Sequence, residues 1–392
     1  MRLIHTADWH LGHELHGFDR EAEHDAFLTW LRALLRARTV DALIVAGDIY
    51  DSVNPPVPVQ RRLFAFLAGA LAENPSLSIV LIGGNHDSGT RLELPQPLLD
   101  SGRCAIIGTM PRSGGAAAPE ATLVPLPGAV CAAIPFLRPG DIGGGGVDGG
   151  DIAAMYARAA EAADPSLPLI MMGHLHLAGG EVSELSERRI VMGGEEAVAA
   201  TVFPARARYV ALGHLHRPQQ ISGPTLIRYA GAPFPLSATE RLYHHSVALV
   251  EIGNGPAQVE LIEIPRPVPL LRAPPSGALE LEDLEAALLA LEIPHSPLGA
   301  PYLEIAVRLS GPQPGLRGRI ETALAGKAVR LVRIERVAEG LAEGMVGVAG
   351  SGIALGDLTP PDVFARRHRE LYGTEPAEDL LTAFHTLWGA VI

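Results

Sequence analysis

Cysteine, lysine and net positive charge are scarce or missing in this sequence. Its 392 residues include two cysteines and one lysine, and the formal net charge is −13. Two cysteines provide neither a disulfide framework nor a cysteine-rich zinc site, so we expect Cys104 and Cys131, each in a short apolar run, to be buried thiols. The acidic balance repels a polyanion such as DNA, and any nucleic-acid site must therefore be local.

Long apolar runs and an ATP-binding motif are also missing. No stretch approaches the roughly 18 apolar residues of a membrane-spanning helix, and no signal-peptide pattern precedes the first apolar run. We therefore expect a cytoplasmic protein, nucleoid-associated if it acts on DNA, that makes no membrane contact. The motif Gly-x-x-x-x-Gly-Lys-Ser/Thr does not occur, so no P-loop ATP site is expected in this chain.

The order of apolar runs indicates an α/β fold. Within the first hundred residues, short apolar runs alternate with amphipathic helical patterns, which is typical of β-α-β units. A proline cluster at 265–275 predicts a domain boundary, and a smaller α/β pattern follows it. Two helical patterns close the chain after a glycine-rich stretch. We expect a main domain at 1–265, a small domain at 266–340, a linker at 341–356 and a helical segment at 357–392. The main predicted elements are strands at 3–7, 42–46, 78–82, 303–309 and 329–337, and helices at 21–37, 59–71, 280–291 and 316–324.

Two surface features each leave two interpretations open. Between Arg308 and Arg336, basic residues outnumber acidic ones, which fits either a phosphate-contacting surface or an ordinary solvated surface. The last predicted helix carries an apolar stripe with i, i+1, i+4, i+7, i+8 spacing, and this stripe binds either another protein or the chain's own domain. The candidate partner-binding residues of the two terminal helices are Val363, Phe364, Leu380, Leu381, Phe384, Leu387 and Trp388.

Five short clusters place oxygen and imidazole ligands at or just after predicted strands. Because the carboxyl ends of strands gather ligands in α/β sheets, these loops are expected to converge. An Asp/Asn/His set without cysteine suits hard or borderline divalent ions such as Mn²⁺, and it fits Zn²⁺ and Fe²⁺ less exclusively. The candidate ligands outnumber what one ion needs, and a bridging carboxylate, for which we expect Asp48, fills the shells of two ions. The clusters are Asp8-Trp9-His10, Gly47-Asp48, Gly83-Gly84-Asn85-His86-Asp87, Gly173-His174-Leu175-His176 and Gly213-His214-Leu215-His216.

A pair of bound divalent ions has a direct use in phosphoester hydrolysis. It holds the phosphate, lowers the pKa of a bound water and neutralises the charge of the in-line transition state. His86 stands beside the candidate ligand Asn85. If its imidazole is not a ligand, it can protonate or stabilise the leaving oxygen.

In order and residue type, these clusters resemble the motifs of the calcineurin-like metallophosphoesterase superfamily. Longer segments, among them His5 to Gly12, Val45 to Asp51 and Ala211 to Pro218, resemble the SbcD family, the nuclease subunits of bacterial SbcCD complexes and relatives of the Mre/Rad-type DNA repair nucleases. The resemblance implies a four-layer α/β/β/α sandwich with a small α/β capping domain and a C-terminal helical pair.

The same resemblance implies roles for individual residues. His86 would be the catalytic histidine, and the cofactors would be two Mn²⁺ ions, with Mg²⁺ as a substitute. One ion would be held by Asp8, His10, Asp48 and His216, and the other by Asp48, Asn85, His174 and His214.

The function implied by the resemblance is that of a DNA nuclease. It would degrade double strands from 3′ to 5′ and cut single strands and hairpins, in DNA repair, recombination and replication. An SbcC-type, SMC-like ATPase would bind the C-terminal helices, and two copies of the chain would form a homodimer within a heterotetramer. The small domain would cap DNA at the mouth of the site.

Two other functions fit parts of the sequence. A metallophosphatase acting on phosphoproteins or small nucleotides would use the same ligands, but Asp48 leads into Ile-Tyr-Asp and not into the Asp-Arg-Gly run of protein phosphatases. A scaffold that keeps its metal site only as structure would not need His86, and the presence of His86 argues against it.

Overall fold

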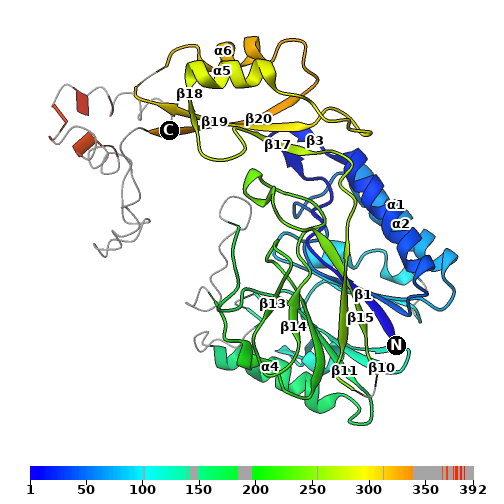
Figure 1. Cartoon of the computed structure of the whole chain (residues 1–392). Coiled ribbons are helices and arrows are strands. Elements are labelled where there is room, and N and C mark those ends of the chain that lie inside the picture. The colour runs from blue at the N-terminus through cyan, green and yellow to red at the C-terminus, as the bar shows by residue number, and fades with distance from the viewer. Residues whose placement is uncertain are drawn as a thin grey trace. The chain divides into compact units, whose positions relative to one another are not determined.

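The computed structural model describes residues 1–99, 102–138, 140–141, 149–183, 197–253, 255–311 and 313–338, and isolated residues between 364 and 384. Contacts divide the chain into one compact unit, Met1–Val337, and a second, Ala338–Ile392. The first unit contains two six-stranded sheets and one four-stranded sheet (Figure 1). Among the described residues, no helix has the length and apolarity needed to cross a membrane.

In the first sheet, four neighbouring strands are parallel, and the two strands at one edge are joined to them and to each other by antiparallel pairing. Along each central strand, side chains alternate between the two faces of the sheet. In β1, Ile4 packs toward helices α1 (Glu21–Ala37) and α2 (Val57–Glu73), while Leu3 packs toward the second sheet. The strand order is β16 (Gln258–Glu263), β15 (Ser246–Glu251), β1 (Arg2–Thr6), β4 (Ala42–Ala46), β5 (Ser78–Ile82) and β6 (Cys104–Ile107).

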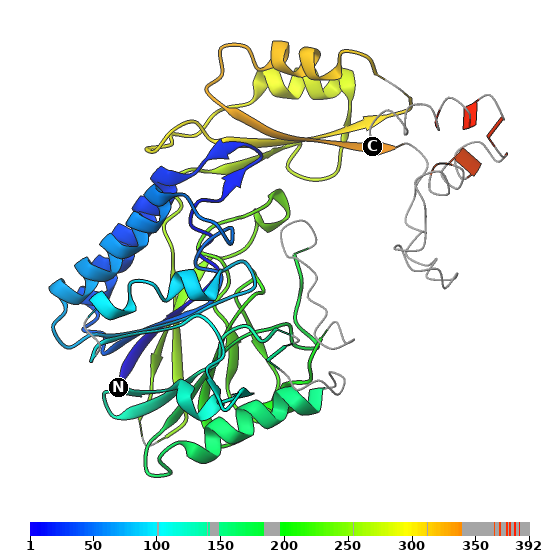
Figure 2. The same cartoon turned by 180° about the vertical axis from the view of Figure 1, so that it is seen from behind.

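The second sheet packs against the first through a shared apolar core that includes Ile44, Ile170 and Tyr209. Its other face is covered by α4 (Gly149–Ala162), as Figure 2 shows. Tyr156 of this helix packs into a separate apolar core. The layers therefore follow the order helix, sheet, sheet, helix, and the predicted four-layer α/β/β/α sandwich is confirmed. The strand order is β13 (Gln219–Ile221), β14 (Ile227–Tyr229), β12 (Ala207–Gly213), β11 (Leu169–His174), β10 (Ala129–Ala133) and β9 (Leu123–Leu126).

A third, smaller sheet has its own apolar core with Leu284, Ile305 and Ile320 at its centre. Its strands are β17 (Leu270–Ala273), β18 (Leu279–Glu280), β19 (Tyr302–Leu309) and β20 (Arg330–Ala338), and its helices are α5 (Leu281–Ala290) and α6 (Leu316–Ala323). These elements form the small α/β part expected from the sequence. The domain boundary at Pro265 stays a prediction.

Most of the elements predicted from the sequence differ from the observed ones by at most two residues at either end. The helix expected at 59–71 begins at Val57 and ends at Glu73, because Pro58 is tolerated in the first helical turn. Cys104 and Cys131 are free and buried in strands, as predicted.

The locally basic segment is largely neutralised by partners. Arg319 lies 2.6 Å from Glu285, Arg333 lies 3.0 Å from Glu304, and Arg317 lies 3.2 Å from Glu321. Arg308 lies 3.6 Å from Glu280. Since these guanidinium groups already face carboxylates, the structure favours the ordinary solvated surface over a dedicated phosphate-contacting one.

Few residues of the segment predicted to form the C-terminal helical pair are described. Phe364 and Phe384 stack with ring centroids 4.3 Å apart, and the Leu381 amide donates to the Ala377 carbonyl as in a helix. Leu380 is 42% exposed. Val363, Leu387, Trp388 and the predicted linker at 341–356 lie outside the described residues.

Candidate metal centre

The candidate ligands lie at or just after the carboxyl ends of five strands in two sheets: His174 is the last residue of β11, and the others lie in loops. Backbone hydrogen bonds join the loops, because the Asp8 amide donates to the Gly47 carbonyl and the His10 amide to the Asp48 carbonyl, both at 3.0 Å. The His214 amide in turn donates to Asp8 Oδ1 at 2.9 Å. The loops that carry the candidate ligands therefore converge, as expected from their places at the strand ends.

Several ligands occupy a strained backbone region. The φ angles of Asp8, His10, Asp48 and His214 are 52°, 43°, 47° and 100°. Non-glycine residues with positive φ cost about 1–3 kcal/mol each and tend to cluster at functional sites. The bonds between the loops hold this conformation.

Neighbouring glycines make the close approach possible. A Cβ atom on Gly84 would overlap the Asp48 carboxylate, and one on Gly47 would overlap the His174 ring. Glycine at both positions therefore lets backbone lie directly against ligand side chains.

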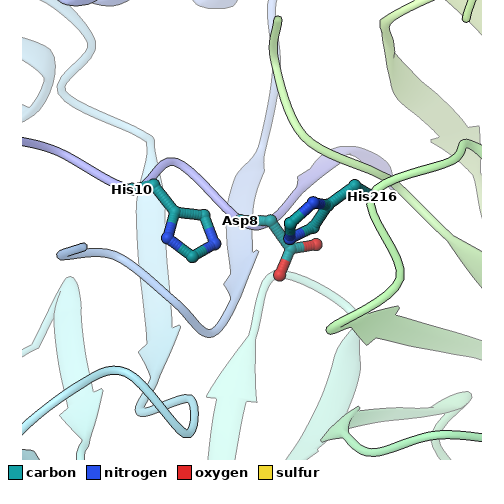
Figure 3. A group of neighbouring side chains, drawn as sticks. All are labelled: Asp8, His10 and His216. Carbon is teal, nitrogen blue, oxygen red and sulfur yellow. The ribbon is translucent and has the colours of Figure 1, made fainter. Parts of the chain in front are cut away.

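Asp48 lies at the centre of the site. Its Oδ2 atom is 3.3 Å from His174 Nε2 and 3.7 Å from His10 Nε2. Asn85 Oδ1 lies 2.8 Å from the same His174 Nε2. Among the described residues, three sets of side chains bring ligand atoms close enough together to hold an ion: Asp8 with His10 and His216 (Figure 3), Asp8 with Asp48 and His174, and His10 with Asp48 and His86.

Two polar atoms in this cluster are buried without a hydrogen-bond partner among the described residues: Asp8 Oδ2 and His10 Nε2. An unpaired buried carboxylate oxygen is costly, and a cation removes the cost by coordinating it. Asp8 and His10 are 0% and 2% exposed, so water does not solvate them from outside. The residues present therefore fit a divalent metal ion.

The proton affinities of the cluster show how strongly its charges interact. Burial raises the pKa of Asp8 to about 7. Burial also acts to raise the pKa of Asp48, but His174 and His10 outweigh it and hold that pKa well below its usual range. Burial likewise opposes protonation of His174, yet the Asp48 carboxylate raises the pKa of His174 to about 9. The oxygen and nitrogen atoms that bind protons in this cluster are atoms that can coordinate a divalent cation instead.

His86 lies at the edge of the cluster. Its backbone amide donates to Asp48 Oδ1 at 2.8 Å, and its Nδ1 hydrogen-bonds the Asp51 carbonyl at 2.9 Å. Its ring packs edge-on against His10, with centroids 4.7 Å apart. His86 is 8% exposed, more than His10 or His216. Its role as a non-ligand stays a prediction.

Three carboxylates around the ligands received no role from the sequence. Asp87 accepts amide protons from Ile49, Tyr50 and Gly84 and so binds the Asp48 loop to the Asn85 loop. Asp51 and Glu240 hydrogen-bond ligand histidines. Asp87 was visible as the last residue of its cluster, whereas no local pattern marks Glu240.

Comparison with known proteins agrees with this geometry. Residues 1–218 match the calcineurin-like phosphoesterase family, and residues 266–372 match a family described as the type 5 capsule protein repressor C-terminal domain. A Rhodobacter capsulatus protein named as the SbcD component of the SbcCD nuclease is 44% identical over 350 residues, which is 84% of this chain and 86% of that protein. The chain belongs to the SbcD family.

Relatives with the same name occur in distant bacteria. The Escherichia coli K12 protein is 37% identical over 290 residues, covering 69% of this chain and 70% of the relative, and that of Bacillus subtilis is 35% identical over 269 residues, covering 65% and 67%. The family resemblance expected from the motifs is thus confirmed. This SbcD chain is a metal-dependent hydrolase of phosphodiester bonds with a divalent-metal site, and the alternative of a phosphoprotein or nucleotide phosphatase is not favoured.

Proposed function

We propose that this chain is the DNA nuclease subunit of an SbcCD-type complex. It degrades double-stranded DNA from 3′ to 5′ and cuts single strands and hairpins during DNA repair and recombination. The observation that carries the proposal is the buried ligand cluster with its unpaired Asp8 Oδ2 and His10 Nε2, in a chain 44% identical to a protein named as a component of the SbcCD nuclease.

Two divalent ions, Mn²⁺ or its substitute Mg²⁺, would be held by two ligand sets that share Asp48. When bound, the pair lowers the pKa of a water and neutralises charge on the phosphate. We name the sets by their residues: shell A is Asp8, His10, Asp48 and His216, and shell B is Asp48, Asn85, His174 and His214. Oxygen and imidazole donors without thiolate fit Mn²⁺ well.

His86 handles the proton of the leaving oxygen. The hydrogen bond from Nδ1 to the Asp51 carbonyl fixes the ring, and the opposite nitrogen is then available to the substrate. Protonated His86 donates from that nitrogen while Nδ1–H stays on the carbonyl. Such proton transfer contributes about 10²–10⁴-fold to rate.

Partner proteins supply the DNA affinity that the acidic chain lacks. The net charge of −13 repels DNA, and Arg319 and Arg333 of the small sheet already pair with carboxylates, so DNA binding by the chain alone is weak and salt-sensitive. An SbcC-type ATPase binds the C-terminal helices around Phe364 and Phe384. The small domain caps the DNA at the mouth of the site. The chain works at the nucleoid as a homodimer within a heterotetramer.

The test is Mn²⁺-dependent cleavage of an end-labelled DNA hairpin by the purified chain, with and without the ATPase partner and ATP. A phosphopeptide serves as the alternative substrate. DNA cleavage with the phosphopeptide left intact supports the proposal. Hydrolysis of the phosphopeptide with DNA left whole, even in the presence of the ATPase and ATP, contradicts it.

A further inference from the structure

The two histidines of shell A share a feature on the side facing away from the cluster. His10 Nδ1 lies 3.1 Å from Asp51 Oδ1, and His216 Nδ1 lies 2.8 Å from Glu240 Oε1. A carboxylate at Nδ1 fixes this nitrogen as the N–H donor and makes the opposite nitrogen a more basic metal ligand. Both imidazoles of shell A are thus oriented and made more basic by a negative charge.

Glu240 is fixed in position beside the His216 ring by burial and by a second hydrogen bond. Its side chain is fully buried, and its second oxygen accepts the Leu236 amide proton at 2.7 Å. A buried carboxylate is screened by water less than an exposed one, so its charge acts more strongly on the nearby His216 ring. The side chain of Asp51 is 35% exposed, and its effect is correspondingly weaker.

Shell B lacks this support. His174 Nδ1 hydrogen-bonds the neutral carbonyl of Ala46 at 2.8 Å. Within the described part of the chain, no ion pair joins the His214 ring to a carboxylate. Where shell A has the carboxylate of Asp8, shell B has the amide of Asn85. The one negative ligand of shell B is Asp48, which it shares.

We infer that shell A binds its divalent cation at least about tenfold more tightly than shell B and fills first, with Glu240 and Asp51 as the positioning residues behind the difference. The inference rests on the proposed two-metal site. Removal of a hydrogen-bonding partner from a metal-bound histidine lowers metal affinity about 10–100-fold, and shell A has two such partners. The cation dependence of DNA cleavage then follows the filling of shell B.

The test is titration of the metal-free full-length chain with Mn²⁺, with free Mn²⁺ measured by its electron paramagnetic resonance signal. Two binding steps of one ion per chain are expected, with dissociation constants at least about tenfold apart. Glu240→Gln weakens the tighter step about 10–100-fold and leaves the weaker step nearly unchanged. The matched control, Glu260→Gln, alters an exposed carboxylate that pairs with Arg38 and changes neither step.

Two further variants keep the test decisive if Glu240→Gln does not fold. Asp51→Asn weakens the tighter step in the same direction, and Asn85→Ala removes the weaker step while the tighter one remains. Two steps of equal affinity, or a tighter step unaffected by both carboxylate variants, overturn the inference and leave the proposed nuclease standing. A chain that binds no second ion contradicts the proposed two-metal function itself.

Discussion

Tyr302, in β19 of the small sheet, donates its hydroxyl proton to Glu23 in the first turn of α1 across 2.7 Å. Glu23 also forms an ion pair with Arg20, in which Arg20 Nη2 lies 2.6 Å from Glu23 Oε1. The Arg20 guanidinium in turn donates a hydrogen bond to the Pro235 carbonyl. Pro235 lies five residues before Glu240, the partner of His216. A buried polar chain therefore runs from the small sheet to the loop beside shell A.

Loss of the Tyr302 hydroxyl should destabilise the fold. Tyr302→Phe keeps the ring under Arg330 but leaves Glu23 with one hydrogen bond fewer in a buried place. Hydrogen bonds to charged groups contribute about 1.5–3 kcal/mol, and we expect the free energy of unfolding to fall by about that amount in urea titrations. The control is Tyr156→Phe, whose hydroxyl reaches the Met172 carbonyl only at 3.4 Å. Equal losses for both variants would contradict a special role of the Glu23 contact.

His86→Ala should separate chemistry from metal binding. If His86 transfers a proton and is not a ligand, the variant keeps its Mn²⁺ content while turnover of a DNA hairpin falls at least about 10²-fold. Metal content is measured by elemental analysis after dialysis, and the exposed His295→Ala serves as the control for a lost imidazole. Loss of metal from His86→Ala would assign His86 to the ligands.

Local parts of this structure were predictable from the sequence, and distant pairings were not. The helix Glu21–Ala37 and the strand Ala42–Ala46 were predicted with their observed bounds, because apolar periodicity is a property of neighbouring residues. The ligand loops were found because strand ends converge in α/β sheets. The Tyr302–Glu23 bond spans 279 residues, and the Arg319–Glu285 pair spans 34, so no local pattern reveals either one.

Acid should destabilise the fold through buried neutral histidines. Burial lowers the pKa of His5 to about 3, against about 6.5 when the chain is unfolded. Between these values the unfolded chain binds the proton and the folded chain does not, so stability is full above pH 6.5 and falls as pH drops toward 3. We compare the free energy of unfolding of the two proteins in urea titrations below pH 6. For each pH unit of acidification, we expect this free energy to fall by up to about 1.4 kcal/mol less in His5→Gln than in the wild type. Parallel pH profiles of the two proteins would show that His5 is not the titrating group.

Deletion of residues 357–392 should remove the ATPase partner and spare the chemistry. The ligand cluster lies entirely within the first compact unit, so Mn²⁺-dependent cleavage of single-stranded DNA is expected to persist. Co-purification with the ATPase partner is expected to be lost. A point variant, Phe384→Ala, removes the ring stacked on Phe364 and should weaken the complex in the same direction. Retention of the partner by the deletion variant would place the binding surface elsewhere.

Gly84→Ala should disable metal binding by steric means alone. The added methyl group meets the Asp48 side chain and backbone too closely to fit without a shift, and we expect that shift to displace the Asp48 carboxylate. Since Asp48 is the ligand that the shells share, we expect both Mn²⁺ binding steps to weaken by at least about tenfold in the same titration. Gly253→Ala is the matched control, because its methyl group meets nothing within 4 Å. Unchanged Mn²⁺ binding in Gly84→Ala would mean that Asp48 does not bridge the two ions.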